Sequence, residues 1–334
     1  KTLPSRKSIG ESLKHAISEA EKEARAEARE AESKPGPNTN TSKSDKKSKD
    51  KTAPPVSGTI DSVLDIDHVE IAKQMTLMEC TLMERIRAKE FHKTAWTRKN
   101  AAVIAPNLTK LINMSNRISN WIVTEILKQK NIDDMKELIM KFIRVGKYLQ
   151  SINNFSGVME VATALNNSAI GKLKAAWSAV TGKSREQFEE LNELTSPLGH
   201  YKNYRETFKN RQADAPCIPI IAATLSDLNG YEEVFPTYLQ NGAVNWSKMH
   251  RVADRIYENL AINCSFKILP HEGLQHYIST AQLWVGDAAI CAIADLKMKE
   301  IPKALDKPDI KKASKRKSVM GSGLITDGFS SGPR

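Results

Sequence analysis

The sequence of 334 residues lacks the signatures of many catalytic and membrane-spanning proteins. It has no GxxxxGK[ST] phosphate loop, no GxGxxG after a predicted strand and no protein-kinase signature set. No apolar run reaches about 18 residues, which predicts no membrane span, and the N-terminus lacks the apolar stretch of a secretory signal. These absences favour a cytoplasmic protein that works by binding rather than by covalent chemistry.

Potential metal ligands are scarce and scattered. The four cysteines, Cys80, Cys217, Cys264 and Cys291, are widely spaced, and the seven histidines include no HExxH pair. The cysteines are therefore predicted to be free, mostly buried thiols in a reducing compartment. We expect neither a metal site nor another cofactor.

The net charge of +11 is unevenly distributed along the chain. Residues 1–64 carry 13 basic and 10 acidic side chains, and residues 301–334 carry 8 and 3, which leaves +3 for residues 65–300. A folded region so close to neutral argues against nucleic-acid binding. The basic tail is either simply solvated or in weak contact with acidic lipid, which would recruit the protein to the inner face of the plasma membrane.

Composition divides the chain into four parts. Residues 1–33 are predicted to form a polar, solvated helix, because alanine recurs every four residues among Glu, Lys and Arg. Residues 34–62 are rich in Pro, Gly, Ser, Thr and Lys and are predicted to be a disordered linker. We expect the folded domain at residues 63–300 and a basic, mostly disordered tail at residues 301–334.

Apolar residues within 63–300 recur at helical spacing. Two such runs are Leu108, Leu111, Ile118, Trp121, Ile122 and Ile126, and Met135, Leu138, Ile139, Phe142, Ile143 and Leu149. No long segment alternates with period two, and short breaks bearing Asn, Ser, Gly or Pro separate the runs. The pattern predicts an all-α fold.

Five parts of this region resemble the catalytic domain of Ras-type guanine-nucleotide exchange factors, in the order and approximate spacing of that family. They are IDHVEIAKQMTLMECTLMERI (66–86), APNLTKLINMSNRISNWIVTEIL (105–127), INNFSGVMEVATALNNSAIGKLKAAW (152–177), GHYKNYRETF (199–208) with PCIPIIAATLSDLNGYEE (216–233), and VNWSKMHRVADRIYENL (244–260). The resemblance implies an all-α, bowl-like domain with a protruding helical hairpin. That fold agrees with the helical periodicity.

The resemblance also implies a function. Such a domain promotes GDP release from a Ras-family small GTPase, with Ras favoured here over Rap or Ral, and it catalyses no covalent reaction. It binds the nucleotide-free GTPase better than the loaded form, so each ligand weakens the binding of the other. The alternatives are a scaffold of the same fold that binds a GTPase without causing exchange, and a helical adaptor for other partners.

In this family a helical hairpin is wedged near the switch regions and the nucleotide phosphates. Its first helix is predicted at residues 219–229, and the resemblance places Ser226, Asn229 and Glu233 along the tip as the acting residues. A carboxylate at Glu233 can stand in for a phosphate oxygen and repel the incoming phosphate. Without that role, Glu233 would be an ordinary exposed carboxylate on a turn.

The second hairpin helix is predicted at residues 245–259. An apolar stripe is expected to pack it against its neighbours, and its members are Trp246, Met249, Val252, Ala253, Ile256 and Leu260. Burial of such a stripe would stiffen the hairpin, since apolar burial contributes about 25 cal/mol per Å².

A second set of positions is expected, from the resemblance, to contact the switch II region of the GTPase. The set is Asn113, Ser115, Asn116, Met159, Asn166, Gly171, Tyr201 and Arg205. Arg205 either pairs with a GTPase carboxylate or braces the domain itself. Gly171 stands where several relatives carry a large side chain, and Asn229 stands where the family is often aliphatic or small. Gly230, with Tyr231, replaces a commonly apolar pair. The departures at Asn229, Gly230 and Gly171 give the scaffold alternative its sequence support.

Overall fold

The computed structural model describes residue 60, residues 62–212 and residues 214–300. This part of the chain consists of helices and connecting segments, with two isolated β-bridges and no β-strand, so the all-α prediction is confirmed. None of its helices combines the length and the apolar character that crossing a membrane requires. The expected helix at 1–33, nearly all of the expected linker and the expected tail at 301–334 lie outside the described residues and stay predictions.

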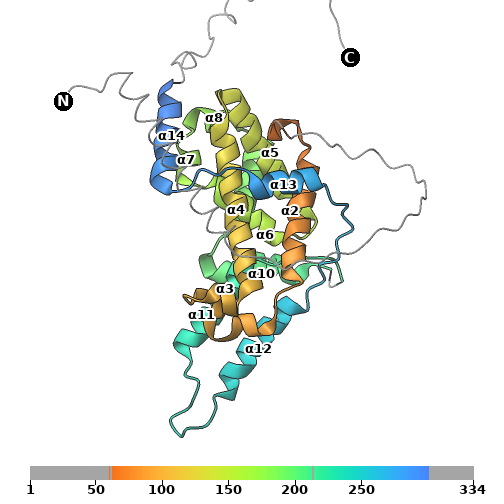
Figure 1. Ribbon diagram of the computed structural model, residues 1–334, viewed down its shortest axis with the longest axis vertical. Helices are drawn as coiled ribbons and strands as arrows, with labels where there is room; N and C mark the ends of the chain where they lie inside the picture. Colours follow the sequence, from red (N-terminus) through yellow and green to blue (C-terminus); the bar gives the residue numbers. More distant parts are fainter. Residues whose placement is uncertain (1–59, 61, 213, 301–334) are drawn as a thin grey trace, which may run out of the picture.

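Four long helices form the centre of the body, by which we mean everything described outside the protruding hairpin (Figure 1). They are α2 (His68–Met83), α4 (Pro106–Lys128), α5 (Ile132–Ser151) and α6 (Phe155–Leu165). Helix α6 packs against α4 and α5, and α2 packs against α4 and α5. Their apolar faces meet in the main core, where the rings of Trp121 and Phe142 lie edge to face with centroids 5.6 Å apart.

Local sequence signals fix the ends of these helices. Pro106 occupies the first turn of α4, where a missing backbone N–H costs nothing. Asn131 caps α5, because its side-chain oxygen accepts a hydrogen bond from the Asp134 amide at 2.8 Å. Asn154 caps α6 in the same way, through the Gly157 amide at 2.8 Å.

Further helices surround this core. They are the 3₁₀ helices η1 (Val63–Asp65) and η2 (Ala88–Thr97), and α3 (Ala101–Ile104), α7 (Ser168–Gly171), α8 (Lys174–Ser178), α9 (Lys183–Thr195), α10 (Leu198–Asn210), α13 (Glu272–Thr280) and α14 (Asp287–Glu300). Helix α9 packs against α5, α6 and α10, and α14 packs against α7.

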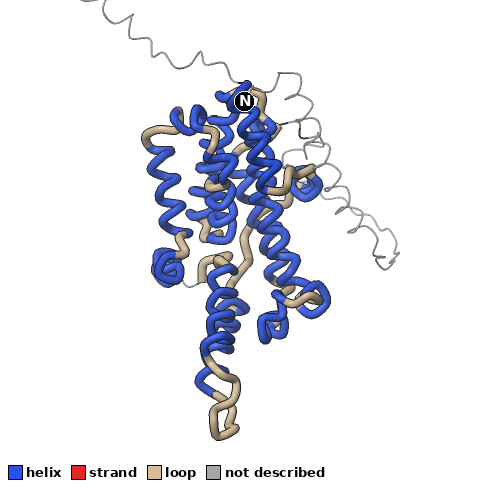
Figure 2. Tube along the Cα trace, turned by 90° about the vertical axis from the view of Figure 1, so that its left-hand side faces the viewer, coloured by secondary structure: helices blue, strands red, loops and turns tan. Residues whose placement is uncertain are grey.

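Helices α11 (Ile221–Val234) and α12 (Trp246–Leu260) form a hairpin that protrudes from one end of the body (Figures 1 and 2). The predicted protruding hairpin is confirmed, but the predicted bounds of its first helix, 219–229, are wrong. The helix starts later because the chain is still extended at Ile218, which forms a β-bridge. It ends later because Gly230 does not interrupt it; an interior glycine costs a helix only about 1 kcal/mol.

The root of the hairpin is tied to the body by backbone hydrogen bonds. The Ile218 amide donates to the Asn153 carbonyl at 3.0 Å, and the Phe155 amide donates to the Ile218 carbonyl at 2.9 Å. The Ile220 amide donates to the hydroxyl of Tyr204 in α10 at 3.2 Å. The entry into α11 is therefore fixed to α6 and α10.

Three of the four free cysteines gather near this root. Cys80 and Cys217 are buried, while Cys264 and Cys291 are half-buried, so the prediction of free thiols is confirmed and the prediction of burial holds for two of the four. The sulfur of Cys264 lies 3.7 Å from the Cys217 carbonyl oxygen, and its thiol interacts with that of Cys80. The wide spacing in the sequence gave no sign of this cluster.

Candidate functional site

Helix α11 presents the three candidate exchange residues on one face. Asn229 and Glu233 follow Ser226 by three and seven residues, which places all three on successive turns of the same side of the helix. All three line an open hollow of about 830 Å³ on the hairpin. The opposite face, with Thr224 and Leu228, is buried.

Two neighbouring carboxylates at the end of α11 have different surroundings. Glu232 pairs with the buried ammonium of Lys248 at 2.8 Å and so joins α11 to α12. Glu233 is exposed, and no side chain in the described part of the chain forms a hydrogen bond or ion pair with it. Glu233 thus offers a free negative charge at the edge of the hollow. It lies in the last turn of a helix rather than in the expected turn.

Asn229 and Gly230 shape the middle of the hollow. Asn229 is half-buried, and a Cβ atom added at Gly230 would meet no atom within 4 Å. The space beside the helix is therefore left open for a partner's atoms. Asn229 is polar and Gly230 is small, as the sequence indicated.

The two hairpin helices are joined by apolar and polar contacts, and the predicted apolar stripe is present only in part. Val252 and Ile256 are half-buried against the apolar cluster that also contains Leu225 and Leu228 of α11.

Other members of the stripe lie in solvent. Trp246 is 68% exposed and Leu260 is 40% exposed, and Ala253 is exposed as well. The buried side chains of α12 are the polar Lys248 and Asn259.

Asn113, Ser115 and Asn116 lie on α4, and Met159 lies on the adjacent α6. Asn113 and Asn116 are exposed, whereas Met159 is half-buried against the core. Ser115 is half-buried and lies beside the buried carboxyl group of Glu160 on α6. The amides and Met159 are available for a partner, whereas Ser115 faces α6.

A pair of buried carboxyl groups lies beneath the surface strip on α4 and α6 that carries Asn113, Ser115, Asn116 and Met159. Glu79 of α2 and Glu160 of α6 are buried side by side and interact directly. Burial raises the pKa of Glu160 well above its usual range, and the neighbouring Glu79 raises it further. Burial also raises the pKa of Glu79, although Ser156 and Asn154 hydrogen-bond to it and oppose the shift. The pair therefore retains a proton under conditions where exposed carboxyl groups are ionised.

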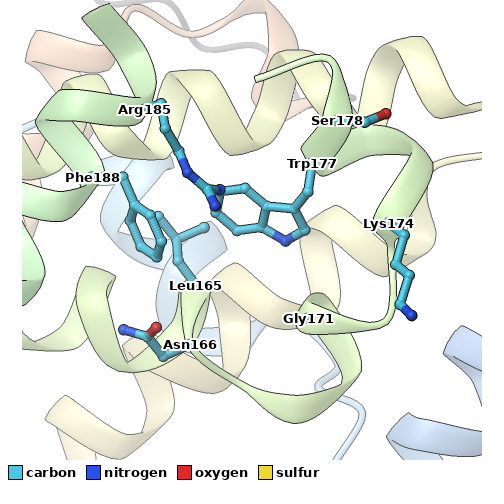
Figure 3. A pocket seen from close by; sticks show the side chains of 8 residues that line it. All are labelled: Leu165, Asn166, Gly171, Lys174, Trp177, Ser178, Arg185 and Phe188. Atoms are coloured by element: carbon cyan, nitrogen blue, oxygen red, sulfur yellow. The ribbon is translucent and has the colours of Figure 1, made fainter. Parts of the chain in front are cut away.

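Asn166 and Gly171 meet in a separate pocket between α6, α7, α8 and α9. Figure 3 shows the Arg185 guanidinium lying against Trp177, with Phe188 beside it. The rings of Trp177 and Phe188 are 4.9 Å apart, and the guanidinium carbon is 5.5 Å from the Trp177 ring centre. A Cβ at Gly171 would contact nothing within 4 Å, so the missing side chain leaves this pocket of about 450 Å³ open.

Tyr201 and Arg205 lie on α10, whose first residues are irregular. Gly199, His200 and Tyr201 all have left-handed backbone angles, with φ of 61°, 56° and 61°. That conformation is costly for the two residues that carry a Cβ. Arg205 supports it through a hydrogen bond from Nε to the His200 carbonyl at 2.6 Å.

The Arg205 guanidinium is also engaged with the hairpin. Its Nη2 lies 2.9 and 2.8 Å from the two carboxylate oxygens of Asp227 on α11. Of the two roles considered for Arg205, the bracing role is therefore present in the structure.

The structure collects the candidate residues into three groups, apart from Tyr201 and Arg205 on α10. One is the hollow on α11, one is the strip on α4 and α6, and one is the pocket between α6 and α9. Sequence reasoning missed Asp227, Lys248 and Arg185, whose partners lie on other helices. In the described part of the chain no three His, Cys, Asp or Glu side chains lie close enough together to hold a metal ion.

Comparison with known proteins identifies the family of this chain. A family model described as the RasGEF domain matches residues 70–250. The chain is 35% identical over 193 residues to Ras guanine nucleotide exchange factor P of Dictyostelium discoideum, a match that covers 58% of this chain and 13% of that protein. It is 32% identical over 211 residues to Ras-specific guanine nucleotide-releasing factor 1 of Rattus norvegicus, covering 63% of this chain and 17% of the relative. The matches thus occupy less than a fifth of these two relatives. The chain belongs to the RasGEF domain family.

Proposed function

We propose that this domain promotes GDP release from a Ras-family small GTPase by placing the α11–α12 hairpin near the switch regions and the nucleotide phosphates. The observation that carries the proposal is the free carboxylate of Glu233, exposed on the same helix face as Asn229 and Ser226 and beside an open hollow. Membership of the RasGEF domain family and the names of the relatives support the same conclusion.

The chemistry needs no covalent step. A GTPase holds its nucleotide through phosphate contacts and a magnesium ion. A carboxylate delivered beside the phosphate-binding groups of the GTPase competes with the phosphate for them and repels it. Because binding of the domain and of nucleotide are linked, tight binding to the empty GTPase raises the rate of nucleotide loss.

The three groups of residues have different parts in this proposal. The strip on α4 and α6, with Tyr201, grips the switch II region. The hollow on α11 acts on the nucleotide site. The pocket opened by Gly171 influences which GTPase is accepted, and Ras is proposed over Rap or Ral because relatives carry the name Ras-specific.

The test is release of fluorescent GDP from purified Ras, Rap and Ral proteins with the full chain added. Acceleration for at least one GTPase is expected. Glu233→Ala together with Asn229→Ala should lower the maximal release rate about tenfold or more, because the transition state loses a charged contact. Glu186→Ala, which removes an exposed carboxylate from α9, is the matched control and should leave the rate unchanged.

Two outcomes would contradict the proposal. If no GTPase releases GDP faster at a high micromolar concentration of the chain, exchange is not the function. If a GTPase binds in a pull-down while its GDP release stays unchanged, the chain is the exchange-inactive scaffold.

A further inference from the structure

One carboxylate on the hairpin is held between two guanidinium groups. Nη2 of Arg205 on α10 donates to both carboxylate oxygens of Asp227 on α11, at 2.9 and 2.8 Å. Arg255 of α12 approaches the same carboxylate, with Nε 3.0 Å from Oδ2. Asp227 is only 14% exposed, so solvent screens this cluster less than an ordinary surface pair.

The cluster joins the body to the hairpin. Arg205 lies on a helix of the body, and Asp227 and Arg255 lie on the two helices of the hairpin. Among the ion pairs formed by the described residues, Arg205–Asp227 is the one that crosses this boundary. The Arg205 guanidinium holds Asp227 through Nη2 and the His200 carbonyl through Nε, so it is fixed on both sides of the boundary. The angle between α11 and α10 is therefore constrained at this point.

The same cluster touches both candidate surfaces. Asp227 and His200 line the hollow that contains the exchange residues. Arg205 donates to the carbonyl of His200, inside the left-handed turn that carries Tyr201. One guanidinium thus links a strained turn of the body to the helix that bears Glu233.

We propose that Arg205 and Asp227 are positioning residues that set the angle of the hairpin against the body, with Arg255 tying the second hairpin helix to the same carboxylate. The proposal rests on the proposed exchange function and adds to it the means by which the hairpin is aimed. Neither residue has to touch the nucleotide.

The charges predict an unequal response to substitution. Arg205→Gln unhooks the hairpin from the body but leaves Arg255 paired with Asp227. Asp227→Asn removes the carboxylate that both guanidinium groups share and leaves them close together, with Glu258 still paired with Arg255 at 2.7 Å, so it should move the hairpin further. The double variant Arg205→Gln/Asp227→Asn removes one of the repelling charges and should recover part of what Asp227→Asn alone loses.

Two measurements on the full chain test these expectations. The first is amide hydrogen exchange in residues 221–260, compared with exchange in α5. The second is GDP release at increasing GTPase concentration, which separates the maximal rate from the half-saturating concentration. For Asp227→Asn we expect hairpin amides to exchange about tenfold faster, a maximal release rate about tenfold lower and a half-saturating concentration within about twofold. Arg205→Gln should show about half of each effect on a logarithmic scale.

Two matched controls remove a single negative charge elsewhere. Glu206→Gln changes an exposed residue one position from Arg205 on α10, whose contact with Lys202 is 3.9 Å long and stays on that helix. Glu232→Gln breaks the Lys248 contact inside the hairpin without touching the body. The first should change neither measurement. The second should speed amide exchange near the tip while leaving residues 221–227 protected.

The proposal is overturned if Asp227→Asn leaves hairpin protection and the maximal release rate at the level of Glu206→Gln. It is also overturned if the double variant is worse than Asp227→Asn by the full effect of Arg205→Gln, because the two residues would then act independently. Amide exchange reports on the hairpin even without a GTPase. Failure of the exchange function would thus appear as an inactive parent chain with the variant pattern in hydrogen exchange intact.

Discussion

Among the largest fully buried side chains of the body are Trp121, Phe142 and Phe155, whereas the buried side chains of hairpin helix α12 are Lys248 and Asn259. The body is held by apolar area removed from water, which is large and insensitive to direction. The hairpin has a smaller apolar contact, in the cluster that contains Leu225 and Leu228, and adds directional contacts: Lys248–Glu232 at 2.8 Å, Asn259–Thr224 at 2.8 Å and the Asp227 cluster.

This difference distinguishes the body, which keeps its shape, from the hairpin, whose angle can change. A close-packed core tolerates little rearrangement, so the surfaces on α4 and α6 keep a fixed shape. A hairpin joined by ion pairs can change its angle at a small cost and be re-aimed by a change in charge. Several exposed large apolar side chains, including Val234, Trp246 and Tyr257, also lie on the hairpin.

The same substitution in the two regions should have the largest difference in effect. Trp121→Ala removes a fully buried ring and should lower the free energy of unfolding by about 3–5 kcal/mol. Trp246→Ala removes a ring that is 68% exposed and should change it by less than about 0.5 kcal/mol. Urea denaturation followed by circular dichroism measures both. Similar losses would mean that the hairpin is built like the body.

The body also contains a buried polar pair, Glu79 and Glu160, and this pair predicts that the free energy of unfolding depends on pH. The pKa of Glu160 is raised by burial and by Glu79. The folded state therefore keeps a proton that the unfolded state releases, so stability is full at low pH and is lost as pH rises above the ordinary carboxyl range. Glu160→Gln should raise the free energy of unfolding at pH 8, by about 1–4 kcal/mol as for other buried charges replaced by neutral groups, and flatten its fall as pH rises from 5 to 8.

Glu90 is the control for this prediction because its pKa moves the other way. Burial alone would raise the pKa of Glu90, but hydrogen bonds from Asn107, Leu108 and Arg87 lower it overall. Its contribution to stability is present at neutral pH and is lost as pH falls through the folded-state pKa. Glu90→Gln should therefore destabilise the chain at pH 7. A matching gain in stability for both variants would show that burial alone governs these carboxyl groups.

A smaller effect is expected from the ion pair inside the hairpin. Lys248→Met leaves Glu232, which is 27% exposed, without its partner and should cost about 1 kcal/mol. Because the contact belongs to the hairpin, the loss should appear as faster amide exchange in residues 231–250, with α5 unchanged. Lys147→Met, which breaks the more exposed pair with Glu190 in the body, should change exchange nowhere by more than about twofold. Global loss of protection in Lys248→Met would argue against a separately held hairpin.

The comparison also explains which features were predictable from the sequence. Helices α4 and α5 were, because their apolar residues face several neighbouring helices and the 3.6-residue period survives in the sequence. The stripe on α12 was predictable only in part. Val252 and Ile256 pack against the apolar cluster of α11, whereas the buried side chains of α12 are Lys248 and Asn259, and Trp246 remains in solvent.

The candidate site was predictable only in part. The predicted helix at 219–229 contained Ser226 and Asn229 but ended before Glu233, which the structure adds to the same helix face, while the role of all three stays a prediction. The Arg205–Asp227 pair was not predictable, because its members are 22 residues apart on different helices. Arg185 reaches Trp177 only through the packing of α9, which periodicity does not specify.

The smallest effects come from adding one methyl group to a helix in each region, and their signs should be opposite. In the body, a Cβ at Gly146 of α5 would lie 2.6 Å from a methyl carbon of the buried Leu191 and 3.3 Å from Val161, so Gly146→Ala should cost about 1 kcal/mol in urea denaturation. In the hairpin, a Cβ at Gly230 would meet no atom within 4 Å. Gly230→Ala should therefore slow amide exchange in α11 by an amount equivalent to about 0.5–1 kcal/mol, because alanine lowers the conformational entropy of the unfolded chain. Destabilisation by Gly230→Ala would show that the space beside α11 is filled in solution and that the hairpin is packed more like the body than its contacts indicate.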